Sequence, residues 1–404
     1  MDFSDSPEEA AYRTRVRAWL EANAPKEGLG IGQGLPVAEE IARSRAWQTR
    51  KAAAGYAQIT WPKEWGGPGG TPMQQVIYNQ EEGRYDVDNP YFTLALGMCL
   101  PTVMAFADEP TKQRFVGRAL RGEDIWCQLF SEPTGGSDAA AARTRALRDG
   151  DGWVVNGQKI WTSGAHLSDY GLLLARTDVD VPKHKGMTMF WLDMRSPGVE
   201  VRPIHQMTDT LGFGFNEVFF TDVRIPDSQR LGAVGDGWKA AIVTLMNERF
   251  SIGGSRRGLD WSDFMRLARE VDALRDAALR EKLADWYVQA EGLKHTTMRT
   301  ITALSRGETP GPENSIGKVV GAVMRQEMAR EAMEMLGEYG VITDPSLAPL
   351  EAEFQNAVLG APGGRIAGGT DEILRNIIAE RVLGLPGDIR LDKDVAFKDI
   401  PTGR

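Results

Sequence analysis

The sequence has few of the residues that cross-link a small protein or bind metal ions. It contains only two cysteines, Cys99 and Cys127, and four histidines. Two thiols exclude a disulfide scaffold and fit a reducing compartment, and the histidine spacing matches no metal site, so we expect no bound metal. The longest apolar stretch, 91–107, is interrupted by Gly97 and Pro101 and is shorter than the roughly 20 apolar residues that span a bilayer. With no apolar leader at the start, we expect a cytoplasmic protein without a membrane span.

Charge of one sign is not concentrated in any part of the chain. The 404 residues include 47 Lys and Arg and 56 Asp and Glu, for a net charge of −9. Because no strongly basic domain stands out, we expect no nucleic-acid partner. The GxSxG elbow, the Walker loop, HExxH and CxxC are also absent from the sequence. The remaining aromatic and glycine-rich loops favour chemistry that an organic cofactor carries.

The periodicity of the sequence changes twice. Residues 1–123 have a mostly helical pattern, with apolar residues three and four apart over 8–22 and 38–54. From 124 to 235, short runs of β-forming residues follow one another, and Asp149-Gly-Asp-Gly152 and Asn156-Gly157 have the form of turns. Helical patterns return over 236–387, before a charged tail, 388–404. Because strands do not alternate with helices, we expect an α+β multidomain protein whose middle domain is an antiparallel barrel or sandwich.

Three segments combine glycines, hydroxyls and tryptophans in a way that suits a flat cofactor. In Trp126-Cys-Gln-Leu-Phe-Ser-Glu-Pro-Thr-Gly-Gly-Ser-Asp138, a strand enters a loop that can approach a ring and a phosphate closely. Asn156-Gly-Gln-Lys-Ile-Trp-Thr-Ser-Gly164 sets an indole beside small donors. The third feature is Trp61-Pro-Lys-Glu-Trp-Gly-Gly67 together with Ala367-Gly-Gly-Thr-Asp-Glu-Ile-Leu-Arg375. Taken alone, the first segment also fits an ordinary Gly/Ser turn, and the indole of the second also fits a strand core.

In combination, these stretches resemble the acyl-CoA dehydrogenase family, from about residue 5 to about residue 387. The resemblance implies an N-terminal helical domain (1–123), a middle antiparallel β-barrel domain (124–235) and a C-terminal four-helix bundle (236–387). It also implies FAD as cofactor and an acyl-CoA thioester as substrate. The reaction of the family is α,β-dehydrogenation to a trans-2-enoyl-CoA, in which a carboxylate takes the α-proton and hydride passes to flavin N5.

The resemblance also assigns residues to the cofactor and the substrate. Two loops of the β domain and the start of the last bundle helix are expected to meet FAD from opposite sides. Trp161 is expected to cover a ring face, Thr162 or Ser163 to bond near N5, and Thr370 to cap the helix, while Ser137 faces the phosphate and pantetheine. The implied cofactor contacts are Gln128, Phe130, Ser131, Gly136, Ser137, Trp161, Thr162, Ser163, Thr370 and Glu372, and the implied substrate contacts are Ser137, Arg249 and Gly368.

The catalytic base departs from the pattern of most straight-chain members, which carry a glutamate immediately before the Gly-Thr of the last motif. Here that position is Gly368, which keeps a backbone N–H for the thioester oxygen and leaves room for a branched or bulky acyl group. Either the protein is not a dehydrogenase or the base lies elsewhere. In a branch similar to isovaleryl-CoA dehydrogenase, the base precedes an arginine on the first bundle helix, where this chain has Glu248 and Arg249. Glu248 shares a helix face with Ala241 and Leu245, so burial would raise its pKa; the alternative is an ordinary ion pair with Arg249.

Two motifs that usually reach the FAD diphosphate of a neighbouring subunit are altered. No Phe stands at the expected offset after Arg269, and Glu334 replaces a glutamine; a carboxylate facing a diphosphate is unfavourable. We expect a homotetramer with a rearranged site or an α2β2 heterotetramer with a related subunit, similar to bacterial steroid side-chain members, with electron-transfer flavoprotein as electron acceptor. The alternatives are an acyl-CoA oxidase or flavin monooxygenase on the same fold, and a partner subunit that only completes another chain's site.

Overall fold

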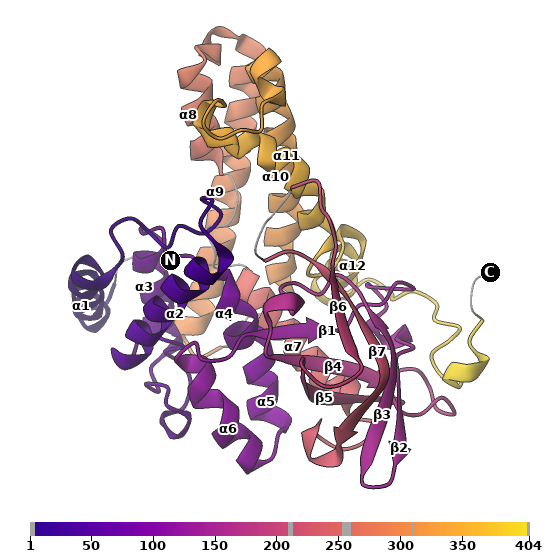
Figure 1. Ribbon diagram of the computed structural model, residues 1–404. Helices are drawn as coiled ribbons and strands as arrows, with labels where there is room; N and C mark the ends of the chain where they lie inside the picture. Colours follow the sequence, from indigo (N-terminus) through magenta and orange to yellow (C-terminus); the bar gives the residue numbers. More distant parts are fainter. Residues whose placement is uncertain (1–4, 209–212, 253–259, 309–310, 402–404) are drawn as a thin grey trace. The chain divides into compact units, whose positions relative to one another are not determined.

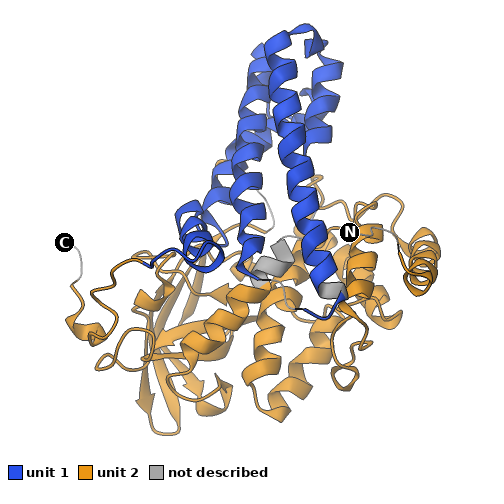
Figure 2. Ribbon diagram, turned by 180° about the vertical axis from the view of Figure 1, so that it is seen from behind, with its two compact units in different colours: residues 1–4, 255–387 blue, residues 5–254, 388–404 orange. Residues whose placement is uncertain are grey.

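A computed structural model describes residues 5–208, 213–252, 260–308 and 311–401, with the side chains of 248–252 and 304–305 outside the description (Figure 1). The chain divides into two compact units, distinguished by colour in Figure 2. Residues 5–254 and 388–404 form one, the sheet unit, and the other, the bundle unit, contains residues 255–387. The chain therefore leaves the sheet unit once and returns to it at its C-terminal end.

Among the described residues, the sheet unit contains the strands β1 to β8 and the helices α1 to α7. Its helices are α1 (Pro7–Asn23), α2 (Val37–Ala53), α3 (Pro72–Glu82), α4 (Pro90–Leu94), α5 (Leu100–Phe106), α6 (Glu109–Leu120) and α7 (Gly237–Ile252). Its strands are β1 (Trp126–Leu129), β2 (Arg145–Asp149), β3 (Gly152–Lys159), β4 (Tyr170–Arg176), β5 (Met187–Asp193), β6 (Val199–Pro203), β7 (Asn216–Pro226) and β8 (Arg230–Leu231). The bundle unit consists mainly of α8 (Trp261–Glu270), α9 (Ala277–Ser305), α10 (Ser315–Leu336), α11 (Glu353–Ile366) and α12 (Asp371–Ile377).

Helices of the N-terminal region begin where the sequence offers side-chain caps. Ser6 and Thr71 each accept a hydrogen bond from the third residue of α1 and α3, and in both cases that residue's side chain bonds back to the cap. Pro101 interrupts the apolar stretch of the sequence but does not break a helix. A π-helical turn, Ala95–Cys99, joins α4 to α5, and Pro101 stands in the first turn of α5, where a missing N–H is tolerated.

The sheet has the strand order β6-β7-β3-β2-β4-β5-β8, with β1 pairing β4. Among the described strands, five of the seven pairings are antiparallel, while β1–β4 and β2–β4 run parallel. The turn predicted at Asn156-Gly157 is wrong, because both residues lie inside β3 at a bulge facing β7. A Cβ on Gly157 would lie 2.6 Å from Thr144 Oγ1, and the Asn156 side chain bonds to Asp222. The glycine therefore serves a close strand approach, and the β2–β3 turn is at Asp149–Gly152.

Strands β4 and β5 are buried on both faces and are apolar over most of their length. Leu172 and Leu174 of β4 belong to a core shared with α4 to α7, whereas Leu173 and Ala175 belong to a second core. This alternation follows from the two-residue period of a strand. Polar groups at the strand ends then need internal partners, because little water reaches them.

A buried ion pair joins the ends of β1 and β3. Lys159 Nζ lies 2.8 Å from Glu132 Oε1 and donates to the Phe130 carbonyl at 2.9 Å, and both side chains are almost fully buried. Glu132 also accepts from the backbone N–H groups of Arg143 and Thr144. Burial acts to raise the pKa of Glu132, but Lys159 and the two amides outweigh it and lower that pKa. Burial lowers the pKa of Lys159, and the opposing effect of the Glu132 carboxylate only partly offsets this lowering. The pair therefore connects three chain segments.

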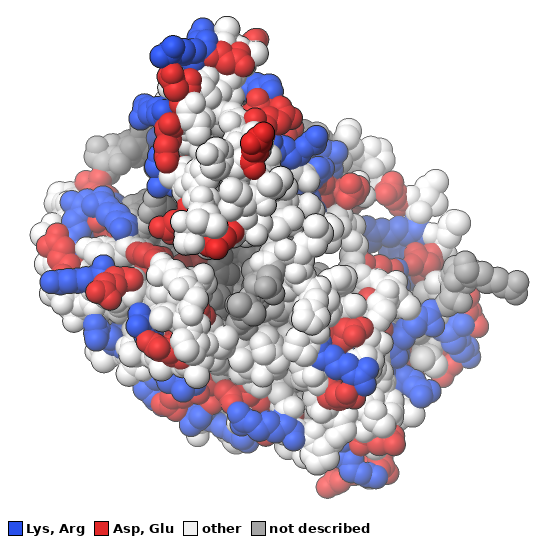
Figure 3. Space-filling model, turned by 45° about the horizontal axis from the view of Figure 1, so that its top comes forward, with Lys and Arg blue, Asp and Glu red and all other residues white. Residues whose placement is uncertain are grey.

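A second polar cluster lies at the far end of β3. Asp227 accepts hydrogen bonds from Arg148, Trp153 and Arg230, which joins the β2–β3 hairpin to the segment after β7. The Arg230 hydrogen bonds, aided by the Trp153 N–H, hold the pKa of Asp227 far below its usual value against a smaller effect of burial. The face of the molecule in Figure 3 carries charges of both signs.

The bundle unit is organised around a single apolar cluster. Phe264 of α8, Trp286 of α9, Met328 of α10 and Phe354 near the start of α11 all belong to it. Helix α11 contains Pro362, a residue that usually ends or kinks a helix. Within the part of the chain that the structure describes, no helix combines the length and the apolar character that a membrane span requires.

Removing the carboxylate of Asp227 should change how stability depends on pH. A lowered folded-state pKa adds stability above the unfolded value of about 3.9, and this stability is lost as the pH falls through the folded value. Asp227→Asn should therefore be less stable than the wild type at pH 7, and the difference should shrink below about pH 4. Urea denaturation at several pH values measures this. A difference that is constant from pH 7 to pH 3 would contradict the assignment.

Breaking the Lys159–Glu132 pair should cost more than replacing both partners. Lys159→Met leaves a buried carboxylate with only its backbone donors, and we expect a loss of about 3–5 kcal/mol in the free energy of unfolding. The double variant Lys159→Met/Glu132→Gln should lose less, because no buried charge remains uncompensated. Denaturant titration of the two variants compares them. An equal or larger loss in the double variant would show that the pair does not act as a charge pair.

Candidate active site

The loops after β1 and β3 lie side by side in the sheet unit. The Ile160 N–H donates to the Ser131 carbonyl at 2.9 Å, directly after the contact of Lys159 with the Phe130 carbonyl. A Cβ on Gly136 would stand 3.6 Å from Ser131 Oγ, so this hydroxyl faces the glycine-rich loop. The structure thus brings together three predicted cofactor residues, Phe130, Ser131 and Gly136.

Trp161 presents its indole to the outside of this cluster. It has φ of 59°, a left-handed value that is rare for an aromatic residue, and 55% of the residue is exposed. Its ring meets that of Phe215 edge-on, with 5.8 Å between centroids. An exposed indole held in a strained backbone conformation indicates a constraint imposed by function.

Thr162 follows in a contrasting environment. Its N–H donates to the Asn216 carbonyl and its carbonyl accepts from Asn216 Nδ2, so β7 anchors it on both sides. The residue is buried, yet Thr162 Oγ1 finds no hydrogen-bond partner among the described residues. A buried hydroxyl without a protein partner leaves a hydrogen bond that a ligand group or a water molecule can make. Together with the exposed indole next to it, this hydroxyl fits one edge and one face of a flavin ring.

The remaining predicted residues of the sheet unit lie around this cluster. Ser163 is half-buried one position further along, and Ser137 is exposed in the loop that leads to Asp138. Gln128 lies within β1, opposite Leu172 of β4, and is half-buried. Among the predicted cofactor contacts in the sheet unit, Ser137 and Ser163 therefore lie in the same loops as the residues described above, whereas Gln128 lies within strand β1.

The last motif lies in the bundle unit. Gly368 and Gly369 both have left-handed φ values, 66° and 94°, and Thr370 caps α12 by accepting from the Ile373 N–H. Lys318 of α10 donates to the Gly369 carbonyl. Glu372 is exposed, and the backbone at the helix start followed by the Thr370 hydroxyl lowers its pKa. The expected cap at Thr370 is present.

Helix α7 belongs to the sheet unit and carries the predicted base, Glu248, and the predicted substrate contact Arg249. Ala241 and Thr244 are fully buried on it, and Thr244 Oγ1 lies 2.8 Å from Thr102 Oγ1 of α5. Glu248 and Arg249 fall within the helical backbone, but their side chains lie outside the description. The predicted base and its arginine are therefore placed on a helix only.

Several supporting residues escaped sequence reasoning. Glu132 and Lys159 stand inside the quoted motifs, but 27 positions separate them, and nothing in the sequence pairs them. Likewise, Arg365 forms an ion pair with the buried Asp371 and donates to Gln326, which ties the start of α12 to α10 and α11. Their signal was a charged residue inside an otherwise apolar or glycine-rich stretch.

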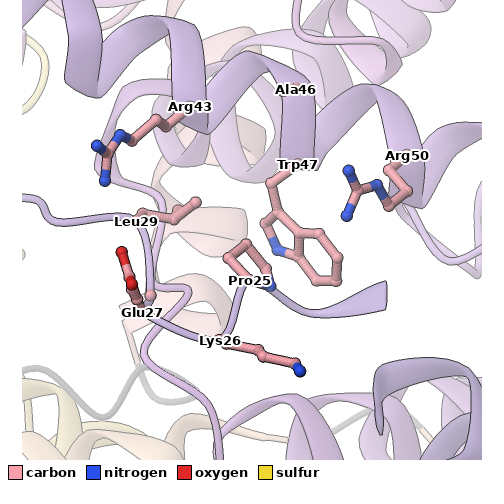
Figure 4. Close-up of a pocket in the computed structure, with 9 residues that line it drawn as sticks. Pro25, Lys26, Glu27, Leu29, Arg43, Ala46, Trp47 and Arg50 are labelled. Carbon is pink, nitrogen blue, oxygen red and sulfur yellow. The ribbon is translucent and has the colours of Figure 1, made fainter. Parts of the chain in front are cut away.

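Two further hollows contain none of the predicted site residues. One, of about 370 Å³, is lined by the loop after α1 and by α2, where Figure 4 shows Arg50 and Lys26 beside Trp47. The other, of about 620 Å³, lies between Trp65, Met104 and Lys112. In the described ranges, no group of three or more His, Cys, Asp or Glu side chains is arranged to hold a metal ion.

Comparisons with known proteins identify the family of this chain. Three family models match the chain: acyl-CoA dehydrogenase N-terminal domain over residues 6–123, middle domain over 127–223 and C-terminal domain over 235–383. "Acyl-CoA dehydrogenase IpdE1" of Mycobacterium tuberculosis is 37% identical over 391 residues, which cover 94% of this chain and 98% of that protein.

Two solved structures have the same fold. One, described as "Tcur3481-Tcur3483 steroid ACAD", has a TM-score of 0.79 at 27% identity and covers 96% of this chain and 100% of that one. The ChsE4-ChsE5 complex of Mycobacterium tuberculosis has a TM-score of 0.76 at 28% identity, with 96% and 100% covered. The predicted order of helical, sheet and helical domains is confirmed. The chain therefore belongs to the acyl-CoA dehydrogenase family, whose members are oxidoreductases that use FAD.

Proposed function

We propose that this protein catalyses the FAD-dependent α,β-dehydrogenation of an acyl-CoA thioester to the trans-2-enoyl-CoA. The observation that carries the proposal is the cluster at the end of β3, where the exposed indole of Trp161 precedes the buried, unpartnered hydroxyl of Thr162. FAD, when bound, supplies a two-electron acceptor for the β-hydrogen. Phe130, Ser131 and Gly136 line the same place, so the unit offers both a face and polar edges for the ring.

Glu248 is the proposed catalytic base. Helical spacing puts position 248 one turn beyond Thr244 and two turns beyond Ala241, which are both buried. A carboxylate at this position continues the helix face of Ala241 and Thr244, and a carboxylate is a group that can take an α-proton from a thioester. Arg249 is proposed to orient this carboxylate. The backbone N–H of Gly368 is the proposed donor to the thioester oxygen, where enolate charge develops.

The proposed substrate is a branched or bulky acyl-CoA. Glycine at position 368 removes the glutamate side chain that straight-chain members carry beside the α-carbon, and this volume becomes available to the substrate. A similar solved structure is described as a steroid enzyme, which favours a polycyclic acyl group. The proposed domains are residues 1–123, 124–235 and 236–387. Further proposed ligand contacts are Gln128, Ser137, Ser163, Thr370 and Glu372.

Glu248→Gln should abolish catalysis while leaving the cofactor in place. The amide cannot accept the α-proton, so we expect anaerobic bleaching of the flavin by acyl-CoA to slow by at least about a thousandfold, as for loss of a general base. The flavin absorbance of the purified variant should match that of the wild type. Stopped-flow spectroscopy with straight, branched, aromatic and steroid acyl-CoAs measures the rate and the substrate class together.

Glu270→Gln is the matched control, because Glu270 is an exposed glutamate near the end of α8. It should bleach at the wild-type rate. Bleaching that survives in Glu248→Gln would transfer the role of base to another residue. Fast reoxidation by oxygen, without electron-transfer flavoprotein, would favour the acyl-CoA oxidase or monooxygenase alternative.

We further propose an α2β2 heterotetramer in which a related subunit supplies the contacts to the FAD diphosphate. Glu334 is exposed on α10, at a position where a carboxylate would repel a diphosphate. A solved relative is a complex of two chains, ChsE4 and ChsE5. This subunit arrangement explains why one chain can keep its flavin-ring loops and lose its diphosphate contacts.

Expressed alone, the protein should retain less than about one FAD per chain, and co-expression with its related subunit should raise that content. Glu334→Gln should increase FAD retention of the single chain about fivefold, the effect of removing about 1 kcal/mol of repulsion. Glu327→Gln, another exposed α10 glutamate, should not. Native mass and flavin absorbance measure both, and a fully flavinated, active tetramer of this chain alone would contradict the heterotetramer.

A further inference from the structure

The C-terminal segment after the bundle unit packs against the sheet unit. The Phe397 N–H donates to the Val181 carbonyl at 2.9 Å and the Lys398 N–H to the Val179 carbonyl at 3.0 Å, while Ala396 forms a β-bridge with Pro182. We call residues 388–400 the strap; its yellow ribbon ends near the C label in Figure 1. The strap is thus held by backbone bonds to the loop between β4 and β5, and the sequence alone predicted only a charged tail.

The Phe397 ring lies on a buried guanidinium. Arg176 Cζ stands 3.8 Å from the ring centroid, and only 1% of Arg176 is exposed. Burial lowers the pKa of Arg176 to about 10, which leaves it charged near neutral pH. A buried cation over an aromatic face is a strong form of this contact. The Phe397 ring therefore covers one face of the Arg176 guanidinium.

Arg176 in turn holds the glycine-rich loop. Its guanidinium donates to the carbonyls of Ala140 and Ala142, and also to that of Lys183. Ala140 and Ala142 follow directly after the segment that carries Gly136 and Ser137. The ring of Phe397 and this loop therefore meet on the same guanidinium, one on its face and the other on its N–H groups.

A second cation repeats the arrangement. Lys183 Nζ lies 2.7 Å from Asp138 Oδ2 of the loop and 2.7 Å from Asp392 Oδ2 of the strap, with the lysine side chain largely buried. One ammonium thus connects the residue after Ser137 to the strap. Burial opposes the charge, but the hydrogen bonds of both carboxylates raise the pKa of Lys183.

We propose that the strap is a positioning element for the loop 133–142, acting through Phe397 on Arg176 and through Asp392 on Lys183. The part of this inference that concerns catalysis rests on the proposed function, in which Gly136 and Ser137 contact cofactor and substrate. The first part of the strap makes few contacts, because Ile389 and Leu391 are 91% and 87% exposed. The backbone bonds at Phe397 and Lys398 keep the strap in place when one side-chain anchor is lost, but the cation that this anchor touches should then hold the loop less firmly.

The test compares hydrogen exchange of the loop in the full-length protein. Several amides there are protected by bonds that depend on the loop's shape, among them those of Gly135, Ala141 and Ala142. Phe397→Ala should speed exchange in peptide 133–142 about tenfold, the scale of a desolvated cation–π contact. Asp392→Asn should speed it about twofold, because Lys183 keeps Asp138. Exchange in strand β5, residues 187–193, should not change.

Lys398→Ala is the matched control. Its exposed ion pair with Asp180 belongs to the strap but touches neither cation, so loop exchange should stay at the wild-type rate. Phe397→Tyr keeps the aromatic face and should restore protection, and it also serves where Phe397→Ala fails to fold. Unchanged loop exchange in Phe397→Ala, or equal loss in Phe397→Tyr, would overturn the proposal.

The kinetic arm separates positioning from global damage. In Phe397→Ala the KM for acyl-CoA should rise about fivefold while kcat stays within about twofold, because the loop acts on binding and not on proton removal. A fivefold fall in kcat with an unchanged KM would contradict the claim that the strap acts on substrate binding through the loop. If no acyl-CoA bleaches the wild-type flavin, the proposed function fails, and the exchange experiment still decides whether the strap positions the loop.

Discussion

The arrangement of the loops after β1 and β3 depends on the buried contact between Lys159 and Glu132. Each charge would be costly alone in that environment, so each requires the other, and together they draw three segments into one place. Lys159 holds the end of β1 through the Phe130 carbonyl, and Glu132 holds the segment before β2 through two backbone amides. Because Lys159 is the last residue of β3, the pair also decides where Trp161 and Thr162 emerge.

Buried cations also join separate chain segments at the other end of the glycine-rich loop. Arg176 and Lys183 each bond the loop and the strap, so a segment more than two hundred residues away in sequence shares their charges. A loop rich in glycine has few side chains of its own with which to fix its conformation, and backbone carbonyls held by buried cations take that role. The loop is thereby bonded to both cations shortly before it returns to the sheet at β2, while Ser137 stays exposed.

The sequence predicted the periodic parts of the chain well, and its failures have specific causes. Helices with caps at Ser6 and Thr71 were recognisable because their signals are local. Strand β2 has no run of apolar residues, since most of its side chains are exposed and three are charged, and α11 contains Pro362, so neither element has a clear local signal. Asn156-Gly157 has the composition of a hairpin turn but is a bulge, since only the neighbouring strand reveals how closely Thr144 approaches.

The sequence by itself determined the family, the order of helical and sheet regions, and the identity of the residues proposed to meet flavin and substrate, because these reside in short contiguous motifs. Only the tertiary structure decided what holds those motifs. The pairs Lys159–Glu132, Arg176–Phe397 and Lys183–Asp392 join residues that are distant along the chain. The left-handed backbone of Trp161 and the unpartnered hydroxyl of Thr162 likewise arise from neighbouring strands. Such contacts depend on burial and on the path of the chain, and no local pattern encodes either.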